Sequence, residues 1–158
     1  MPDSHPGSSP PLFRVREADW GRDRDALRAV RETVFVREQG VPIELEWDGL
    51  DSDCLHLLAE TPEGEAIGTA RLLPDGHLGR MAVLSGWRGR GVGKALLEGL
   101  IAAGRRRGLA RLALNAQTYA LDFYARMGFV VSGDEFIDAG IPHRRMILQL
   151  DSVDVPTT

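Results

Sequence analysis

The chain has 158 residues, enough for one domain with a real core, and its 43% hydrophobic and 27% charged residues are ordinary for a soluble globular protein. The net charge of -4 argues against a nucleic-acid-binding surface, and no apolar run approaches the roughly 20 residues that span a membrane. The single cysteine, Cys54, excludes an internal disulfide, which agrees with a reducing cytoplasm.

The two ends of the chain have compositions typical of disordered tails. The N-terminus, MPDSHPGSSPP, is rich in Pro, Ser and Gly and lacks the basic and apolar regions of a signal peptide. The last residues, DSVDVPTT, have a similar character. We therefore expect a disordered tail over 1–11, one folded domain over 12–150, a flexible tail over 151–158 and a cytoplasmic location.

The first half of the domain predicts a strand, a helix and then three consecutive strands. The helix carries Leu27, Val30 and Val34 on one face, and breaker-rich turns such as TPEGE separate the later strands. An acidic stretch without a clear period, 43–53, is expected to be a loop with about one helical turn. The expected ranges are 13–16 for the first strand, 22–37 for the helix, and 54–60, 66–73 and 77–84 for the three strands.

The second half predicts helices alternating with strands. The helix over 94–108 keeps apolar residues at a 3.6-residue period, and the following strand alternates Leu112 and Leu114. Together with the first half this is an α+β pattern around one mixed sheet. The remaining expected ranges are 109–115 for a strand, 118–127 for a helix, and 129–136 and 144–150 for two closing strands.

A glycine-rich loop lies between the strand over 77–84 and the helix that follows. Gly89, Gly91 and Gly93 expose backbone N–H groups at the start of a helix, where the helix dipole favours an anion. A Walker A loop is excluded because Arg88 stands where its first glycine is required. Read from Gly89, a dinucleotide fingerprint is excluded because Lys94 stands at its third glycine. A plain glycine-rich turn stays open for the loop considered by itself.

Arg88-x-x-Gly91-x-Gly93, after a strand that carries Met81-Ala82-Val83, resembles the pyrophosphate loop of the GNAT superfamily of acyl-CoA-dependent N-acetyltransferases. The order of strands and helices is similar to that of the same superfamily. The resemblance implies a mixed, mostly antiparallel sheet of six to seven strands, flanked by helices and splayed between its fourth and fifth strands. It also implies acetyl-CoA as co-substrate, held through its pyrophosphate by the loop residues Arg88, Gly89, Arg90, Gly91, Val92, Gly93 and Lys94.

The resemblance further implies contacts around the pantetheine arm and the thioester. The backbone of Met81, Ala82 and Val83 would bond the pantetheine amides as a neighbouring strand does. Asn115 would contact the cofactor from the other side, although it equally suits the end of a strand. Tyr124, in FYARMGF, matches a position whose hydroxyl lies near the thioester sulfur and protonates the leaving thiolate. On periodicity alone, Tyr124 is equally suited to be a core aromatic.

Two segments, VFVREQGVPIELEWDGLD (34–51) and GDEFIDAGIPHRRM (133–146), resemble the ElaA-like branch of the family. His143 is a candidate general base for the acceptor amine, or else a histidine that holds a loop. Glu38 either binds the cationic acceptor or pairs structurally. Further polar side chains are expected where the acceptor approaches, namely Gln39, Asp48, Asp51 and Glu135.

The reaction that the resemblance implies is direct attack of a neutral primary amine on the acetyl carbonyl in a ternary complex, with the N–H near Val83 stabilising the carbonyl oxygen. The alternative is a non-catalytic acyl-CoA-binding or regulatory module of the same fold. The expected partner is a small-molecule or protein amine rather than a nucleic acid or membrane, and a homodimer is compatible with the family. No metal-ligand spacing is present, and Cys54 suits a small buried residue better than an acyl-carrying nucleophile.

Overall fold

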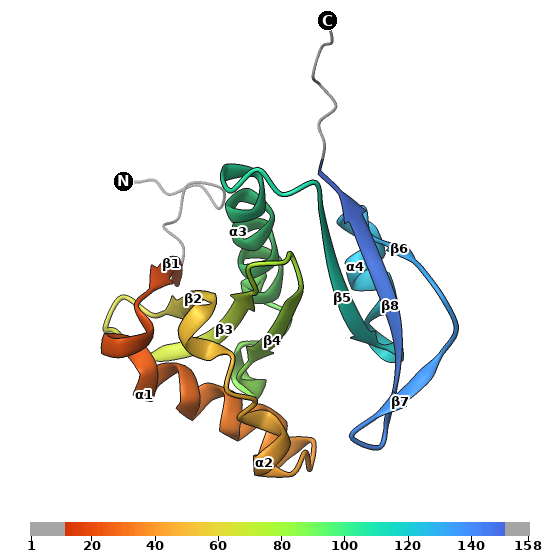
Figure 1. The fold of residues 1–158 in the computed structure, drawn as a ribbon. Coiled ribbons are helices and arrows are strands. Elements are labelled where there is room, and N and C mark those ends of the chain that lie inside the picture. The colour runs from red at the N-terminus through yellow and green to blue at the C-terminus, as the bar shows by residue number, and fades with distance from the viewer. Residues whose placement is uncertain (1–11, 151–158) are drawn as a thin grey trace, which may run out of the picture.

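Two β-sheets lie side by side in the computed structural model, which describes residues 12–150 (Figure 1). The tails expected at 1–11 and 151–158 lie outside the described residues. The strands are β1 (Arg14–Ala18), β2 (Leu55–Glu60), β3 (Ala66–Leu72), β4 (Leu78–Val83), β5 (Arg111–Gln117), β6 (Val130–Val131), β7 (Phe136–Asp138) and β8 (Ile141–Gln149). The α-helices are α1 (Trp20–Arg31), α2 (Ile43–Glu46), α3 (Val92–Arg106) and α4 (Leu121–Arg126). Shorter helical segments are the π-helix η2 (Glu32–Glu38) and the 3₁₀ turns η3 (Asp51–Asp53), η4 (Ser85–Trp87) and η5 (Thr118–Ala120).

The first sheet has the strand order β1-β2-β3-β4 with antiparallel neighbours, and helices cover both of its faces. Leu57 of β2 packs so closely on α3 that a Cβ added to Gly99 would lie 2.7 Å from its side chain. His56, the preceding residue, stacks on Trp20 of α1 with 4.8 Å between ring centroids. All six residues of β2 are therefore buried, and the strand lacks the alternation of a half-exposed one.

The second sheet has the order β5-β8-β6, and β7 pairs with the other end of β8. Leu112 and Leu114 of β5 are buried, as their alternation predicts. The hairpin between β7 and β8 turns at Ala139 and Gly140, whose φ values of 53° and 78° are the left-handed values that a two-residue hairpin loop needs. This hairpin sets His143 directly opposite Phe136.

Among residues 12–150, the two sheets are paired only near the start of β4 and β5. His77 forms a parallel bridge with Ala113, and the N–H of Ala113 donates to the carbonyl of Gly76 at 3.0 Å. From this point the two strands diverge, and neither is paired with the other along its length (Figure 1). The splay expected between the fourth and fifth strands is therefore confirmed.

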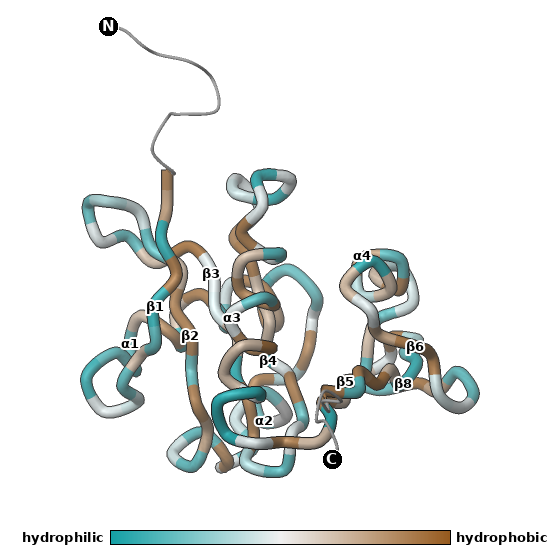
Figure 2. The backbone as a smooth tube through the Cα atoms, turned by 90° about the horizontal axis from the view of Figure 1, so that it is seen from above, coloured by the Kyte–Doolittle hydropathy of each residue, from teal (hydrophilic) through white to brown (hydrophobic). Residues whose placement is uncertain are grey.

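One core holds the two sheets together through α3. Leu97 and Leu100 of α3 are fully buried in the same cluster as Leu57 of the first sheet and Leu112 of the second. Figure 2 shows hydrophobic stretches gathered along the strands and α3, with hydrophilic stretches on the peripheral loops. Within residues 12–150, no helix has the length and apolar character required to cross a membrane.

The fold class is confirmed, and the ends of most elements differ from the expected ranges by a few residues, most notably at three places. There are eight strands in two sheets among the described residues, because the strand expected over 129–136 is interrupted at Ser132 and Gly133 to give β6 and β7. The last strand begins at Ile141, earlier than expected, because the hairpin turn lies at Ala139 and Gly140. The helix expected over 22–37 is α-helical only to Arg31 and continues as the π-helix η2.

Candidate active site

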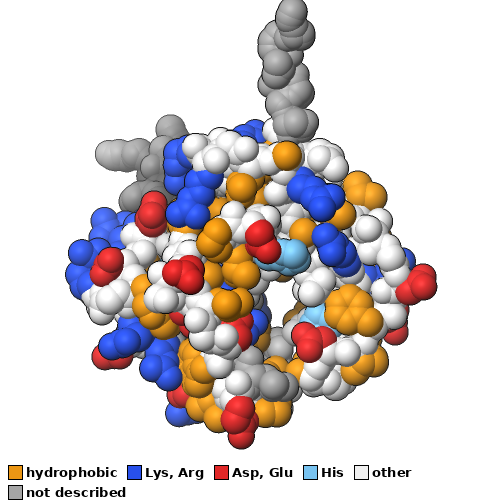
Figure 3. Space-filling model, viewed as in Figure 1, with side chains coloured by type: hydrophobic (Ala, Val, Ile, Leu, Met, Phe, Trp, Pro, Cys, Tyr) orange, Lys and Arg blue, Asp and Glu red, His pale blue; other side chains and the backbone are white. Residues whose placement is uncertain are grey.

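A cavity of about 370 Å³ lies between the two sheets, where β4 and β5 diverge. Figure 3 shows it as an opening through the face of the molecule. It is lined from both sides, by Met81 of β4 and by Asn115, Tyr124 and His143 of the second half. These four predicted site residues, far apart in the sequence, thus share one cavity.

Tyr124 crosses the splay from α4 toward β4. Its hydroxyl lies 3.9 Å from the sulfur of Met81, and its ring packs edge-on against Phe123 and Phe129. Burial raises the pKa of Tyr124 to about 12, because the low-dielectric surroundings disfavour a phenolate. The hydroxyl is therefore a proton-bearing donor throughout the physiological pH range.

His143 is held in one orientation by two contacts. Its ring stacks on Phe136, with 5.8 Å between centroids and 20° between planes, and its Nδ1 lies 2.7 Å from the carbonyl oxygen of Ile141. Because a carbonyl only accepts hydrogen bonds, Nδ1 must carry the proton of the neutral ring. The neutral imidazole then keeps an unprotonated Nε2, the atom that a general base requires.

The end of β4 presents backbone groups to the gap. The N–H of Leu84 donates to the carbonyl of Ile67, at the edge shared with β3. Because backbone groups of a strand alternate between its two edges, those of Met81 and Val83 point away from β3 and toward β5. The side chain of Ala82 is buried against Val30 and Val34 of the α1–η2 segment, so its contribution to the gap would come from the backbone alone.

The glycine-rich loop forms an open approach to the N-terminus of α3. Gly89 and Gly91 have φ values of 76° and 88°, and apart from the adjacent residues no atom lies within 4 Å of a Cβ built on either. Gly91 is the N-cap of α3, and no side chain caps the helix. A 15-residue helix with an uncapped, exposed N-terminus provides backbone N–H donors and a positive dipole end for an anion.

Other loop residues have structural contacts as well. Val92 is 1% exposed and belongs to the core, whereas Lys94 is exposed. A Cβ on Gly93 would lie 3.6 Å from the ring of Phe123, an ordinary van der Waals contact, so the packing of α4 against α3 does not itself require a glycine here. The guanidinium of Arg90 lies over the ring of Trp87 at 4.9 Å.

Glu38 does not line the cavity but pairs with the loop. Its two carboxylate oxygens lie 2.6 Å and 2.7 Å from Nη1 and Nη2 of Arg88. These hydrogen bonds lower the pKa of Glu38 and raise that of Arg88. Both carboxylate oxygens are engaged by Arg88, so the geometry favours the structural pair over binding of a cationic acceptor by Glu38.

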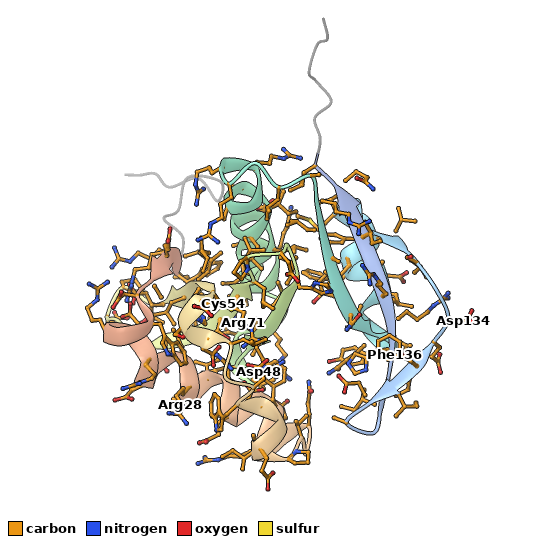
Figure 4. The ribbon with its side chains drawn as sticks, in the orientation of Figure 1. Arg28, Asp48, Cys54, Arg71, Asp134 and Phe136 are labelled. Atoms are coloured by element: carbon orange, nitrogen blue, oxygen red, sulfur yellow. The ribbon has the colours of Figure 1, made fainter. Side chains whose placement is uncertain are left out.

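Two acidic residues expected at the acceptor side belong to an ion-pair network on the first sheet. Asp51 Oδ1 lies 2.8 Å from Nη1 of both Arg31 and Arg71, and Asp48 pairs with the other side of Arg71 (Figure 4). Burial opposes ionisation of Asp48, but its hydrogen bonds with Arg71 and the N–H of Leu50 outweigh it and lower its pKa to about 2. Neither carboxylate lines the cavity, nor does Glu135.

Five polar residues of the cavity wall were missed in the sequence: Glu46, Arg80, Gln117, Tyr119 and Asp138. Arg80 has a left-handed φ of 49° at a bulge in β4, and its Nε lies 3.2 Å from Oε1 of Glu46. A bulge of this kind has no recognisable pattern in the amino-acid sequence, so the position of Arg80 could not be predicted. Asp138 was detectable, since Asp-Ala-Gly-Ile is a hairpin turn that sets it opposite Ile141.

Among residues 12–150, no group of three or more His, Cys, Asp or Glu side chains is arranged to hold a metal ion. Cys54 is partly buried, its thiol donates to the carbonyl of Leu50 at 3.2 Å, and burial raises its pKa. These contacts favour the structural interpretation of Cys54 over a nucleophilic one.

Comparison with known proteins gives one consistent result. A family model described as "Acetyltransferase (GNAT) domain" matches residues 31–150. A Bacillus subtilis (strain 168) protein whose name proposes acetyltransferase activity is 38% identical over 146 residues, 89% of this chain and 99% of that protein. A solved acyl-CoA N-acyltransferase from Pseudomonas aeruginosa is 32% identical with a TM-score of 0.77, covering 86% of this chain and 99% of its own. Escherichia coli ElaA is 26% identical with a TM-score of 0.77, covering 87% of this chain and 100% of its own.

Proposed function

The chain belongs to the GNAT family of acetyltransferases, with ElaA among its structural neighbours, and from this premise we propose that it moves an acetyl group from acetyl-CoA to a primary amine. Both substrates bind together, and the amine attacks directly. The observation that carries the proposal is the shared cavity at the splay, which has Tyr124 on one wall and His143 on another. The acceptor is an amine of a small molecule or of a protein.

The residues around the splay fit acetyl-CoA. The exposed loop with its two left-handed glycines and the uncapped N-terminus of α3 would hold the pyrophosphate through backbone N–H groups. The backbone edge of β4 at Met81 and Val83, which faces away from β3, would hold the pantetheine amides, with Asn115 on the opposite wall. Acetyl-CoA supplies the acetyl thioester, whose C–S bond breaks as a C–N bond forms to the amine.

His143 acts as the general base in this proposal. An amine attacks only when neutral, so one proton must leave the nitrogen, and Nε2 of His143 accepts it directly or through one water. The hydrogen bond from Nδ1 to the carbonyl of Ile141 keeps the ring in the required tautomer. Stacking on Phe136 limits rotation of the ring and so fixes the direction of Nε2.

Tyr124 stabilises the departing sulfur. The pKa of Tyr124 is raised to about 12, whereas a thiol has a pKa of about 8.5. Complete transfer of the phenolic proton to a thiolate is therefore thermodynamically unfavourable. We therefore assign Tyr124 the donation of a hydrogen bond to the developing thiolate. The proton that the amine loses to His143 balances the one that the free thiol finally gains.

The experiment that tests this function has two steps. Calorimetric titration with acetyl-CoA, and with ATP and NAD as controls, tests whether the splay selects an acyl-CoA. A panel of primary amines is then incubated with acetyl-CoA and the protein, and N-acetylated product is detected by mass spectrometry. Selective binding followed by product formation supports the proposal, whereas binding of ATP or NAD in place of acetyl-CoA contradicts it.

A further inference from the structure

The side chain of Arg88, the first arginine of the glycine-rich loop, is engaged in hydrogen bonds with other residues of the same chain. Nε of Arg88 donates to the carbonyl of Val83 at 2.9 Å, and its two terminal nitrogens donate to the carboxylate of Glu38 at 2.6 Å and 2.7 Å. A bidentate pair of this kind fixes the plane of the guanidinium as well as its position. Arg88 therefore joins the end of β4 to the end of η2.

Gln39, the next residue after Glu38, makes a second connection. Its Oε1 accepts a hydrogen bond from Nε2 of Gln117, at the end of β5, at 2.9 Å. The backbone N–H of Gln39 donates to the carbonyl of Val34 at 3.0 Å, which closes the wide turn of the π-helix. Two consecutive residues thus connect the end of η2 to both strands at the open end of the splay.

We infer that Arg88, Glu38 and Gln39 form a brace that fixes the ends of β4 and β5, and that Arg88 is a positioning residue rather than a phosphate ligand. The inference rests on the proposed function, in which the pantetheine arm lies along the end of β4. Both terminal nitrogens of Arg88 donate to Glu38, so the backbone N–H groups of the loop and of α3 would bind the pyrophosphate.

The expected size of the effect is modest. The side chains of Arg88 and Glu38 are 44% and 39% exposed, and ion pairs at such sites contribute little because water screens them. The brace acts on the geometry of Val83, so its loss should weaken binding of the pantetheine portion by about fivefold.

The test compares the binding of two donors by the wild type, three brace variants and one control variant. Acetyl-pantetheine lacks the pyrophosphate and the nucleotide of acetyl-CoA. Its affinity therefore measures the contacts with the ends of β4 and β5 and does not include those with the glycine-rich loop. Dissociation constants for both donors are measured by calorimetry for the wild type, Glu38→Gln, Arg88→Gln and the double variant. We expect each single substitution to weaken the binding of acetyl-pantetheine by about fivefold. The double substitution should weaken it no further, since the two residues act as one unit.

Arg90→Gln is the matched control, because it removes the same charge from the same exposed loop and leaves the brace intact. Because the loop loses a positive charge, Arg90→Gln should weaken the binding of acetyl-CoA, whereas the affinity for acetyl-pantetheine should be unchanged. Midpoints of thermal unfolding for all variants show whether any effect arises from partial unfolding instead.

Two results would overturn the inference. One is a loss of acetyl-CoA affinity of more than tenfold in Arg88→Gln with acetyl-pantetheine unaffected, which would make Arg88 a phosphate ligand. The other is an affinity for acetyl-pantetheine equal to that of the wild type in Glu38→Gln, Arg88→Gln and the double variant. A wild type that binds no acetyl-CoA at all would instead remove the proposed function, so the two failures are distinguishable.

Discussion

The Nδ1 atom of His143 lies 2.7 Å from the carbonyl oxygen of Ile141, two residues before it on β8. This contact determines which ring nitrogen bears the proton, because the carbonyl offers no hydrogen to donate. The short hairpin that begins β8 therefore selects the tautomer of a histidine in the cavity wall. The proposed chemistry depends on that selection.

His143→Asn should lower kcat by about a hundredfold, the lower range for loss of a general base. The asparagine amide can still donate to the carbonyl of Ile141, so the contact is retained while the base is removed. His77→Asn is the control, because His77 pairs with Asp75 and lies outside the cavity. Steady-state kinetics with a saturating amine measure the effect, and equal kcat values in the two variants would exclude His143 as the base.

Tyr124→Phe should lower kcat by about ten- to a hundredfold, because a hydrogen bond to a charged group contributes roughly 1.5–3 kcal/mol. The calorimetric affinity for acetyl-CoA should change little. If affinity falls and kcat does not, the hydroxyl serves binding and has no part in leaving-group stabilisation.

The raised pKa of Tyr124 also predicts a loss of stability in strong alkali. The unfolded chain ionises this phenol near pH 10, whereas the folded protein keeps it protonated to about 12. Between these values the unfolded state binds fewer protons, so the free energy of unfolding falls as the pH rises. Denaturant unfolding at pH 9 and pH 11 should show this fall, and Tyr124→Phe should show less of it.

Gly91→Ala should weaken acetyl-CoA binding by at least about tenfold. Its φ of 88° lies in the left-handed region, where a Cβ costs roughly 1–2 kcal/mol, and the added methyl would stand in the approach to the N-terminus of α3. Gly108→Ala is a close control, since Gly108 has a φ of 73° beyond the other end of α3 and open space around it. Equal affinities in the two variants would show that strain, and not the loop, accounts for any loss.

Asp48→Asn should destabilise the protein at pH 7 and have little effect at pH 2. The carboxylate is ordinarily protonated below its unfolded value of 3.8, and its pairing with Arg71 lowers the folded pKa to about 2. Its contribution to stability is therefore present above pH 3.8 and is lost as the pH falls toward 2. Urea unfolding of both proteins at the two pH values measures this, and an equal difference at each would contradict the ionic pairing.

The sequence predicted the features that local chemistry determines. The apolar period of α3, the burial of Leu112 and Leu114 and the turns that join the strands are local features, and each is confirmed. The family resemblance of the loop predicted the splay, which is a property of the whole sheet.

The unpredicted features depend on contacts between distant residues. Arg31 is only 1% exposed and would be costly to bury without Glu46 and Asp51, which lie 15 and 20 residues away. Their pairing is invisible in a pattern of charges along the chain, so Asp51 was expected at the acceptor site instead. The hydrogen bond between the side chains of Gln39 and Gln117, which are 78 residues apart, could not be predicted from the sequence for the same reason.

Formation of N-acetylated amine from acetyl-CoA, measured by mass spectrometry for the wild type and for the double variant His143→Asn/Tyr124→Phe, tests the central claim most directly. The account predicts amine-dependent product with the wild type and at least about a hundredfold less with the double variant, although both proteins bind acetyl-CoA with similar affinity. Binding of acetyl-CoA by the wild type without product from any amine of the panel would contradict it and favour a non-catalytic acyl-CoA-binding module.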